Sequence, residues 1–284
     1  MKPTFLFLII LLASPAFAQR PAESILEGYF REGYELMQAQ EFDQALEKFD
    51  RHIRESGLTQ ESDYFALYFR AVCNYYLENF KMSIEDIDRY VTRFSASPQP
   101  YLLRATCYRH LGDEDAQLRD LNEGLSRKPE EDAPFDPELF RWRASILVNR
   151  EQYDSALTDI RRALDIREES ETYSMLAFVQ YNQGRYDSAL MAVNKGISIN
   201  HSFVSSYIYG SMFCLQEEDN ARALVYADLG LRVDDREYRL WFHRGIALVE
   251  LNNIDKGCSA LNKAFYNGVD EAGDYLSEFC YKIE

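Results

Sequence analysis

Histidine and cysteine are the side chains best suited to metal binding and nucleophilic chemistry, and this chain has four histidines and five cysteines. The histidines lie far apart, at His52, His110, His201 and His243, and none has a partner at metal-ligand spacing. No cysteines form a CxxC pair, and the chain has no HExxH, nucleophile-elbow or phosphate-binding glycine motif. We therefore expect no metal, no cofactor and no enzymatic activity.

The carboxylates are numerous but suggest no general acid and base. The chain has 47 Asp and Glu against 31 Lys and Arg, a formal net charge of −16. Runs such as Glu130-Glu131-Asp132 and Glu168-Glu169 are typical of solvated loops and helix ends. This charge repels phosphate backbones and anionic lipid, so we expect no nucleic-acid binding and, among protein partners, a preference for basic ones.

A pattern of small and bulky residues recurs with a period of about 34 residues. In most copies a bulky residue is followed four positions later by Gly or Ala, which we call the anchor residue, and then by another bulky residue. Twelve positions after the anchor comes a second small residue, followed by a bulky one. The third copy departs from this pattern at Gln117, and the second and sixth copies are irregular. The sixth copy fits with one inserted residue before Ala223. The anchors are Gly33, Ala71, Ala105, Ala144, Ala177, Gly210 and Gly245.

This pattern predicts an all-α protein built from seven helical hairpins. Small residues on both helices of a hairpin let the backbones approach closely, and the bulky residues fill the space around that contact. One hairpin cannot bury its apolar face alone, so neighbouring hairpins stack and share a core. The predicted repeats lie near residues 26–57, 64–95, 98–130, 137–168, 170–202, 203–236 and 238–268, with a capping helix at 270–283.

The hinges between the paired helices resemble those of the tetratricopeptide repeat (TPR) family. The best copies are Tyr153-Asp154-Ser155-Ala156-Leu157 and Gly184-Arg185-Tyr186-Asp187-Ser188-Ala189-Leu190. The resemblance covers roughly Leu26 to Asn267 and implies a right-handed α-α superhelix, a single solenoid domain over residues 19–284. The ending, from Lys256 to Cys280, also resembles the last repeat and cap of exported bacterial TPR proteins.

The resemblance further implies a concave groove lined by the first helix of each repeat. Many residues expected there are aromatic, which favours a protein or peptide partner because Tyr and Trp give large contact areas at low entropic cost. The alternative is that several of these rings pack between neighbouring repeats. The predicted groove residues are Phe30, Tyr34, Phe65, Tyr68, Phe69, Tyr75, Tyr76, Arg109, Arg141, Trp142, Phe178, Tyr181, Tyr207 and Phe242.

Cys258 and Cys280 flank the turn at Asn267-Gly268 at similar distances. In an antiparallel helix pair such positions come opposite each other, so a disulfide could fasten the capping helix to the last repeat. The alternative is two buried thiols. Cys73 and Cys107 occupy equivalent places in adjacent repeats, where helices sit about 8–10 Å apart, so we expect no bridge between them.

The N-terminus has the layout of a secretory signal peptide. Lys2 precedes an apolar run from Phe5 to Ala13, and Ala16-Phe17-Ala18 is a cleavage site of the small-x-small type. We expect cleavage after Ala18 and export to the periplasm or the medium. The run is too short to span a bilayer comfortably, and no later segment resembles a membrane span.

Two functions fit these observations. The first is an interaction module that holds a partner protein or peptide in its groove outside the cytoplasm. The second is a structural or assembly subunit of a cell-envelope complex, which would bind through other surfaces.

Overall fold

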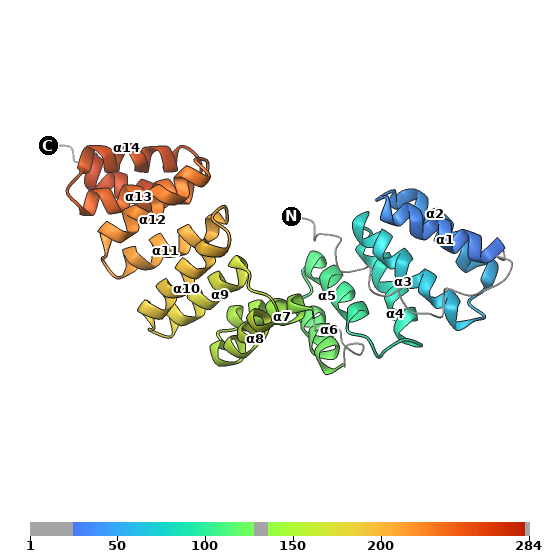
Figure 1. Cartoon of the computed structure of the whole chain (residues 1–284). Coiled ribbons are helices and arrows are strands. Elements are labelled where there is room, and N and C mark those ends of the chain that lie inside the picture. The colour runs from blue at the N-terminus through green and yellow to red at the C-terminus, as the bar shows by residue number, and fades with distance from the viewer. Residues whose placement is uncertain (1–24, 128–135, 282–284) are drawn as a thin grey trace. The chain divides into compact units, whose positions relative to one another are not determined.

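The structure of the protein is a computed structural model, which describes residues 25–127 and 136–281. The predicted signal peptide, its cleavage site and the loop around Pro129 lie outside the described residues. The chain divides into two compact units, residues 1–130 (unit 1) and 131–284 (unit 2), and each is described by itself (Figure 1). The single domain over residues 19–284 stays a prediction.

The described part of the chain is helical, as predicted, and contains seven consecutive helical hairpins. None of its helices is long and apolar enough to cross a membrane. Unit 1 contains α1 (Ile25–Gln38), α2 (Phe42–Ser56), α3 (Glu61–Tyr76), α4 (Phe80–Val91), α5 (Gln99–Leu111) and α6 (Glu114–Ser126).

Unit 2 contains four hairpins and the cap. Its hairpins are formed by α7 (Pro137–Asn149), α8 (Tyr153–Ile166), α9 (Ser170–Asn182), α10 (Tyr186–Ile199), α11 (Val204–Gln216), α12 (Asn220–Val233), α13 (Tyr238–Glu250) and α14 (Ile254–Phe265).

Every hinge reverses the chain through one residue in the left-handed backbone conformation, with φ between 57° and 75°. Glycine adopts this conformation without steric cost, and other residues adopt it under mild strain. In six hairpins this residue stands seven positions after the predicted anchor. The hinge residues are Gln40, Glu78, Gly112, Glu151, Gly184, Glu218 and Asn252.

The sixth hairpin corrects the sequence alignment by one residue. Its hinge residue, Glu218, lies seven positions after Ser211, not after Gly210. Ser211 is completely buried, as an anchor must be, and Ala223 then follows it by twelve positions without an insertion. The anchor of this hairpin is therefore Ser211. The inserted residue that the sequence pattern required does not exist.

A second repeated feature joins the two helices of a hairpin through a buried ion pair. In three hairpins the residue before the anchor is Arg, and an Asp on the second helix of the same hairpin accepts two hydrogen bonds from its guanidinium. Arg104 donates from Nε to Asp120 Oδ2 at 2.8 Å and from Nη2 to Oδ1 at 2.6 Å. Arg70 with Asp86, and Arg143 with Asp159, repeat this geometry.

The same guanidinium also links neighbouring hairpins. Arg70 Nη1 lies 2.6 Å from Asp50 of the preceding hairpin, and Arg104 Nη1 lies 2.5 Å from Asp88. In unit 2, Arg244 Nε donates to Asp228 of the preceding hairpin at 2.7 Å. These contacts add directional bonds to the apolar packing between successive hairpins.

In other hairpins the residue before the anchor is not Arg, and a different pair of side chains joins the two helices. In the first hairpin the charges are exchanged, and Lys48 Nζ lies 2.5 Å from Glu32. In the sixth, Gly210 precedes the anchor and Tyr226 takes the space, since a Cβ on Gly210 would lie 2.8 Å from that ring. The Tyr226 hydroxyl donates to Asn194 of the preceding hairpin at 2.9 Å. The first hairpin thus pairs opposite charges at this position, and the sixth pairs a glycine with a large ring.

Within each unit, neighbouring first helices contact one another, from α1 to α3 to α5 and from α7 through α9 and α11 to α13. Contact between successive second helices is at most marginal in the described residues. The first helices of each unit therefore lie side by side along the stack. We call the surface that these helices present the inner face of the unit.

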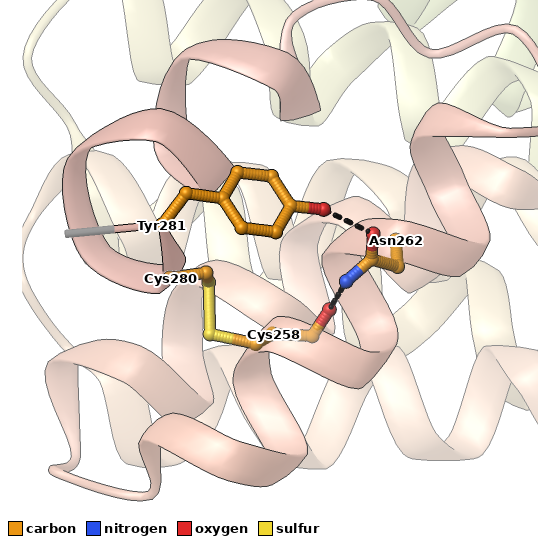
Figure 2. The surroundings of a disulfide bond; sticks show 4 residues. All are labelled: Cys258, Asn262, Cys280 and Tyr281. Carbon is orange, nitrogen blue, oxygen red and sulfur yellow. Dashed lines mark hydrogen bonds between the residues drawn. A yellow bond between two sulfur atoms is a disulfide. The ribbon is translucent and has the colours of Figure 1, made fainter. Parts of the chain in front are cut away.

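The cap is shorter and less regular than the predicted helix. It comprises α15 (Ala272–Tyr275) and a π-helical turn, η3 (Leu276–Cys280). Ala272 and Leu276 pack onto Leu261 and Ala264 of α14. A disulfide joins Cys258 of α14 to Cys280, as Figure 2 shows. The two cysteines thus form a disulfide rather than two buried thiols.

Candidate functional site

The inner face of unit 1 carries five of the predicted groove rings in half-buried positions: Phe30, Tyr34, Phe65, Tyr75 and Tyr76. Phe30 and Tyr34 come from α1, and the other three come from α3. Four of these rings pack against the core of unit 1, and Tyr75 contacts Tyr76, Phe80 and His110. These rings leave part of their apolar area at the surface.

Two predicted groove residues of unit 1 belong to its core instead. Tyr68 is 4% exposed and Phe69 is 2% exposed. Phe69 lies between the rings of Tyr34, at 5.3 Å, and Phe49, at 6.0 Å, so it joins two hairpins. Burial raises the pKa of the Tyr68 hydroxyl, whose ring lies 5.2 Å from Tyr90. Phe69 therefore packs between repeats, as the alternative expected, and Tyr68 is buried beside Tyr90 of its own hairpin.

Aromatic stacking links the hinge ends of the hairpins in unit 1. Phe42 of α2 stacks on Tyr76 of the next hairpin, with ring centroids 4.5 Å apart. Phe80 of α4 stacks in the same way on His110 of the next, also at 4.5 Å. Partial burial lowers the pKa of His110, and the neighbouring Arg109 acts in the same direction. Arg109, predicted for the groove, is exposed at this end.

In unit 2 the predicted groove residues of α7 lie beside acidic side chains. Arg141 is half-buried, and its guanidinium lies 3.2 Å from Glu138 and 3.1 Å from Glu169. Burial, followed by the nearby carboxylate of Asp136, raises the pKa of Glu138. Trp142 is also half-buried. Arg141 is therefore a bridge between α7 and the start of α9.

Farther along the inner face of unit 2, rings of neighbouring helices contact one another. Phe178 of α9 lies 5.9 Å from Tyr209 of α11. Tyr181 stacks on Phe213 at 4.4 Å and donates a hydrogen bond to Glu217 at 3.1 Å. Phe178, Tyr181 and Tyr209 are half-buried, whereas Phe213 is fully buried. The partly exposed rings of this face thus contact one another, and Tyr181 packs on a fully buried ring.

Tyr207 does not belong to the inner face. It is 5% exposed, and its hydroxyl donates to the backbone carbonyl of His201. With Ser211 as the anchor, Tyr207 takes the place that Trp241 holds in the next hairpin. Ile208 and Met212, both half-buried, occupy the inner positions that the shifted alignment missed. Counting Ser as a small anchor residue would have found them.

Ser211 and His243 form a buried contact between α11 and α13. The Ser211 hydroxyl donates to the carbonyl of Ile208 at 3.0 Å, and His243 Nδ1 lies 2.7 Å from the Ser211 hydroxyl oxygen. Because the hydroxyl proton is already used, Nδ1 carries a proton and donates it. Burial lowers the pKa of His243 to about 4, so the ring is neutral at pH 7. This pair is structural, since Ser211 has no exposed surface.

The described residues contain no group of acidic, histidine and cysteine side chains arranged to hold a metal. The three cysteines outside the disulfide, Cys73, Cys107 and Cys214, are buried. Burial raises the pKa of Cys107 to about 11 and that of Cys73 to about 12, so both are poor nucleophiles at neutral pH.

An open pocket of about 390 Å³ lies between α12 and α13. Its lining includes Leu231, Arg232 and Trp241. The Trp241 ring has Lys263 Nζ 3.8 Å and the Arg244 guanidinium 5.5 Å from its centroid. These cations already cover the indole, so the pocket belongs to the packing of the last hairpin.

The described helices form stacked helical hairpins, and comparison with solved structures identifies the fold. No protein-family model and no curated protein matches the sequence. A TPR protein of Parabacteroides merdae matches 89% of this chain and 97% of its own, with a TM-score of 0.64 and 16% identity. The C-terminal part of a TPR protein of Cytophaga hutchinsonii matches 87% of this chain and 99% of its own, with a TM-score of 0.66 and 14% identity.

A third similar structure is YrrB, described as a TPR protein with an unusual peptide-binding site. It matches 68% of this chain and 97% of its own, with a TM-score of 0.53 and 16% identity. At these identities the likeness concerns the fold. The chain has the tetratricopeptide-repeat fold.

Proposed function

We propose that this protein is a non-catalytic interaction module that holds a segment of a partner protein on its inner faces, outside the cytoplasm. The observation that carries the proposal is the set of half-buried rings on first helices in both units, such as Tyr75 and Tyr76 in unit 1 and Phe178 and Tyr181 in unit 2. Contacts with neighbouring side chains already restrict these rings, so they lose little conformational entropy when a partner binds.

Two further points support this function. YrrB, which shares the fold, is described as having a peptide-binding site. The three free cysteines are buried, so the inner faces present rings rather than thiols. A rigid aromatic surface of this kind is suited to recognition rather than to reaction.

The proposed location rests on the N-terminal sequence. Lys2, the apolar run from Phe5 to Ala13 and the Ala16-Phe17-Ala18 site are the parts of a signal peptide. Expression in a bacterial host should give a mature chain that begins at Gln19 and is recovered with the periplasm or the medium. N-terminal sequencing checks this, and an intact Met1 in the cytoplasm would contradict it.

A second candidate function, as an assembly subunit, is favoured by one observation on the outer side of α12. Val225, Leu229 and Val233 follow one another at helical spacing and are 56%, 41% and 40% exposed. An exposed apolar row of this kind is suited to a permanent protein contact. It would make the second helices, rather than the inner face, the binding surface.

One experiment separates the two candidates. The mature chain is immobilised and partners are captured from the native cell-envelope fraction. We expect Tyr75→Ala/Tyr76→Ala or Phe178→Ala/Tyr181→Ala to lose the captured partner, and the outer-face control Val225→Ser/Leu229→Ser to keep it. Retention by both inner-face variants, with loss by the control, would replace the first candidate with the second. Circular dichroism confirms that each variant is folded.

A further inference from the structure

The inner face of unit 2 does not end at the last hairpin, because aromatic residues of the cap continue it. Tyr275 of α15 meets Phe242 of α13 edge to face, with ring centroids 5.7 Å apart. Phe279 of η3 stacks on Tyr275 at 6.1 Å. Phe242 is a predicted groove residue, and all three rings are half-buried. The cap therefore adds two rings to the face.

The exposed charged side chains of the described cap are all acidic. The cap carries four exposed carboxylates, at Asp270, Glu271, Asp274 and Glu278, and the described residues from 264 to 281 include no Lys or Arg. Asp274 directly precedes Tyr275, and Glu278 directly precedes Phe279. Glu250, at the end of α13, is also exposed. Arg239, at the start of α13, is the one base at an inner position of that helix.

We propose that this end of unit 2 binds a basic amphipathic segment of a partner protein. Its apolar side chains would lie on Phe242, Tyr275 and Phe279, and its Lys or Arg side chains would reach the surrounding carboxylates. The inference rests on the proposed function and names the chemistry of its partner. Half-buried rings favour apolar contact and cation–π contact, and the acidic rim selects the sign of the charge.

The disulfide holds the part of this surface that the cap supplies. Cys280 follows Phe279 directly and is bonded to Cys258. Next to it, the Tyr281 hydroxyl donates to Asn262 at 2.7 Å, and Asn262 donates to the carbonyl of Cys258 at 2.9 Å (Figure 2). The cap helices are only four and five residues long, too short to be stable alone. Binding should therefore depend on the disulfide.

The test uses a fluorescein-labelled synthetic helix with leucine on one face and lysine on the other. Fluorescence anisotropy follows its titration with the full mature chain. We expect saturable binding that weakens with salt, and no binding of the same peptide with every Lys replaced by Glu. Tyr275→Ala/Phe279→Ala should weaken binding about tenfold or more, the usual cost of losing central aromatic contacts. Cys258→Ser/Cys280→Ser should weaken it in the same direction.

Matched charge variants separate this site from general attraction to an acidic protein. Asp274→Asn/Glu278→Gln removes two carboxylates from the cap, and Glu85→Gln/Asp165→Asn removes two exposed carboxylates from second helices. We expect only the cap variant to lose affinity and salt dependence. Equal loss in both, or unchanged binding by Tyr275→Ala/Phe279→Ala, would overturn the inference. The proposed function would survive that result if partner capture still required Phe178 and Tyr181.

Discussion

Asn74 lies in the core of unit 1 with an exposed fraction of 1%, and neither atom of its side-chain amide has a hydrogen-bond partner. It stands three residues after its anchor, where other hairpins place Leu36, Leu147 or Leu248. A buried amide without partners loses its hydration and gains nothing in return. This position is therefore a local weakness in an otherwise apolar contact.

Replacing this amide should stabilise unit 1. We expect Asn74→Leu to raise the free energy of unfolding by about 1–3 kcal/mol, the cost of an unpaired buried polar group. Urea denaturation of the mature chain measures the change. Thr172→Val is a parallel change in unit 2, because the buried Thr172 hydroxyl also has no partner. If Asn74→Leu lowered stability, the amide would have partners, such as buried water, that compensate for its burial.

His243 should make the stability of unit 2 depend on pH. Its folded-state pKa is about 4, below the value of about 6.5 in an unfolded chain, so the unfolded state binds the proton more readily. The stabilising contribution is complete above pH 6.5 and is lost as the pH falls toward 4. The full loss is roughly 3 kcal/mol.

Urea denaturation between pH 4 and 7 measures this slope, and His243→Asn provides the comparison. The Asn amide can donate to Ser211 as the imidazole Nδ1–H does, but it does not titrate. The carboxylates contribute equally to both proteins, so the difference between the two curves isolates the histidine. Parallel curves over this range would show that His243 has an ordinary pKa.

At the scale of helices and hairpins, the repeating small residues were enough to predict the seven hairpins. Close helix contact needs a small side chain at a fixed position of each repeat, and such residues can be recognised directly from the sequence. The error in the sixth hairpin has the same origin. Gly210 and Ser211 are both small, and only the hinge geometry at Glu218 shows which of them is the anchor.

The burial of individual rings was less predictable. Tyr68 and Tyr75 are the same residue type on the same helix, yet Tyr68 is buried and Tyr75 is half-buried. The difference depends on which ring of a neighbouring element reaches each position, such as Tyr90 beside Tyr68. A period in one sequence does not contain that information. The pairing of Arg104 with Asp120, by contrast, recurs at constant spacing and could have been read beforehand.

The contribution of the buried ion pair to stability can be tested by replacing it with the apolar residues that the next hairpin has at the same positions. Asp159 is 2% exposed and is held by Arg143, whereas the next hairpin has Leu176 and Ala192 at the same two positions. We expect Arg143→Leu alone to cost about 3–5 kcal/mol, because it leaves a buried carboxylate without its partner.

Adding Asp159→Ala to that variant should recover most of the lost stability. The double variant copies the apolar pair of the next hairpin and leaves no buried charge uncompensated. Urea denaturation of the single and double variants gives the coupling between the two sites. A double variant as unstable as Arg143→Leu would mean that the guanidinium stabilises the hairpin through contacts other than Asp159.

For the molecule as a whole, the contacts between neighbours set where stability is lost first. In a stack of hairpins each element packs only on those beside it, so an end element has half of the usual support. The cap is the C-terminal end element of the described chain, and it is also its shortest. The cap carries two rings of the partner surface that we propose, yet it has little stability of its own. The disulfide that joins the cap to α14 therefore matters for binding as well as for stability.

Removing this disulfide should release the cap while leaving the distant helices intact. Cys258 and Cys280 are separated by 22 residues, and closing a loop of that size restricts the unfolded chain by about 3 kcal/mol. We expect Cys258→Ser/Cys280→Ser to accelerate hydrogen exchange in residues 272–280 and in the end of α14, with no change in α1 to α6. A reducing agent should reproduce this effect in the wild type and have none in the variant. Uniform acceleration along the chain would instead show that the bond stabilises the array as one cooperative body.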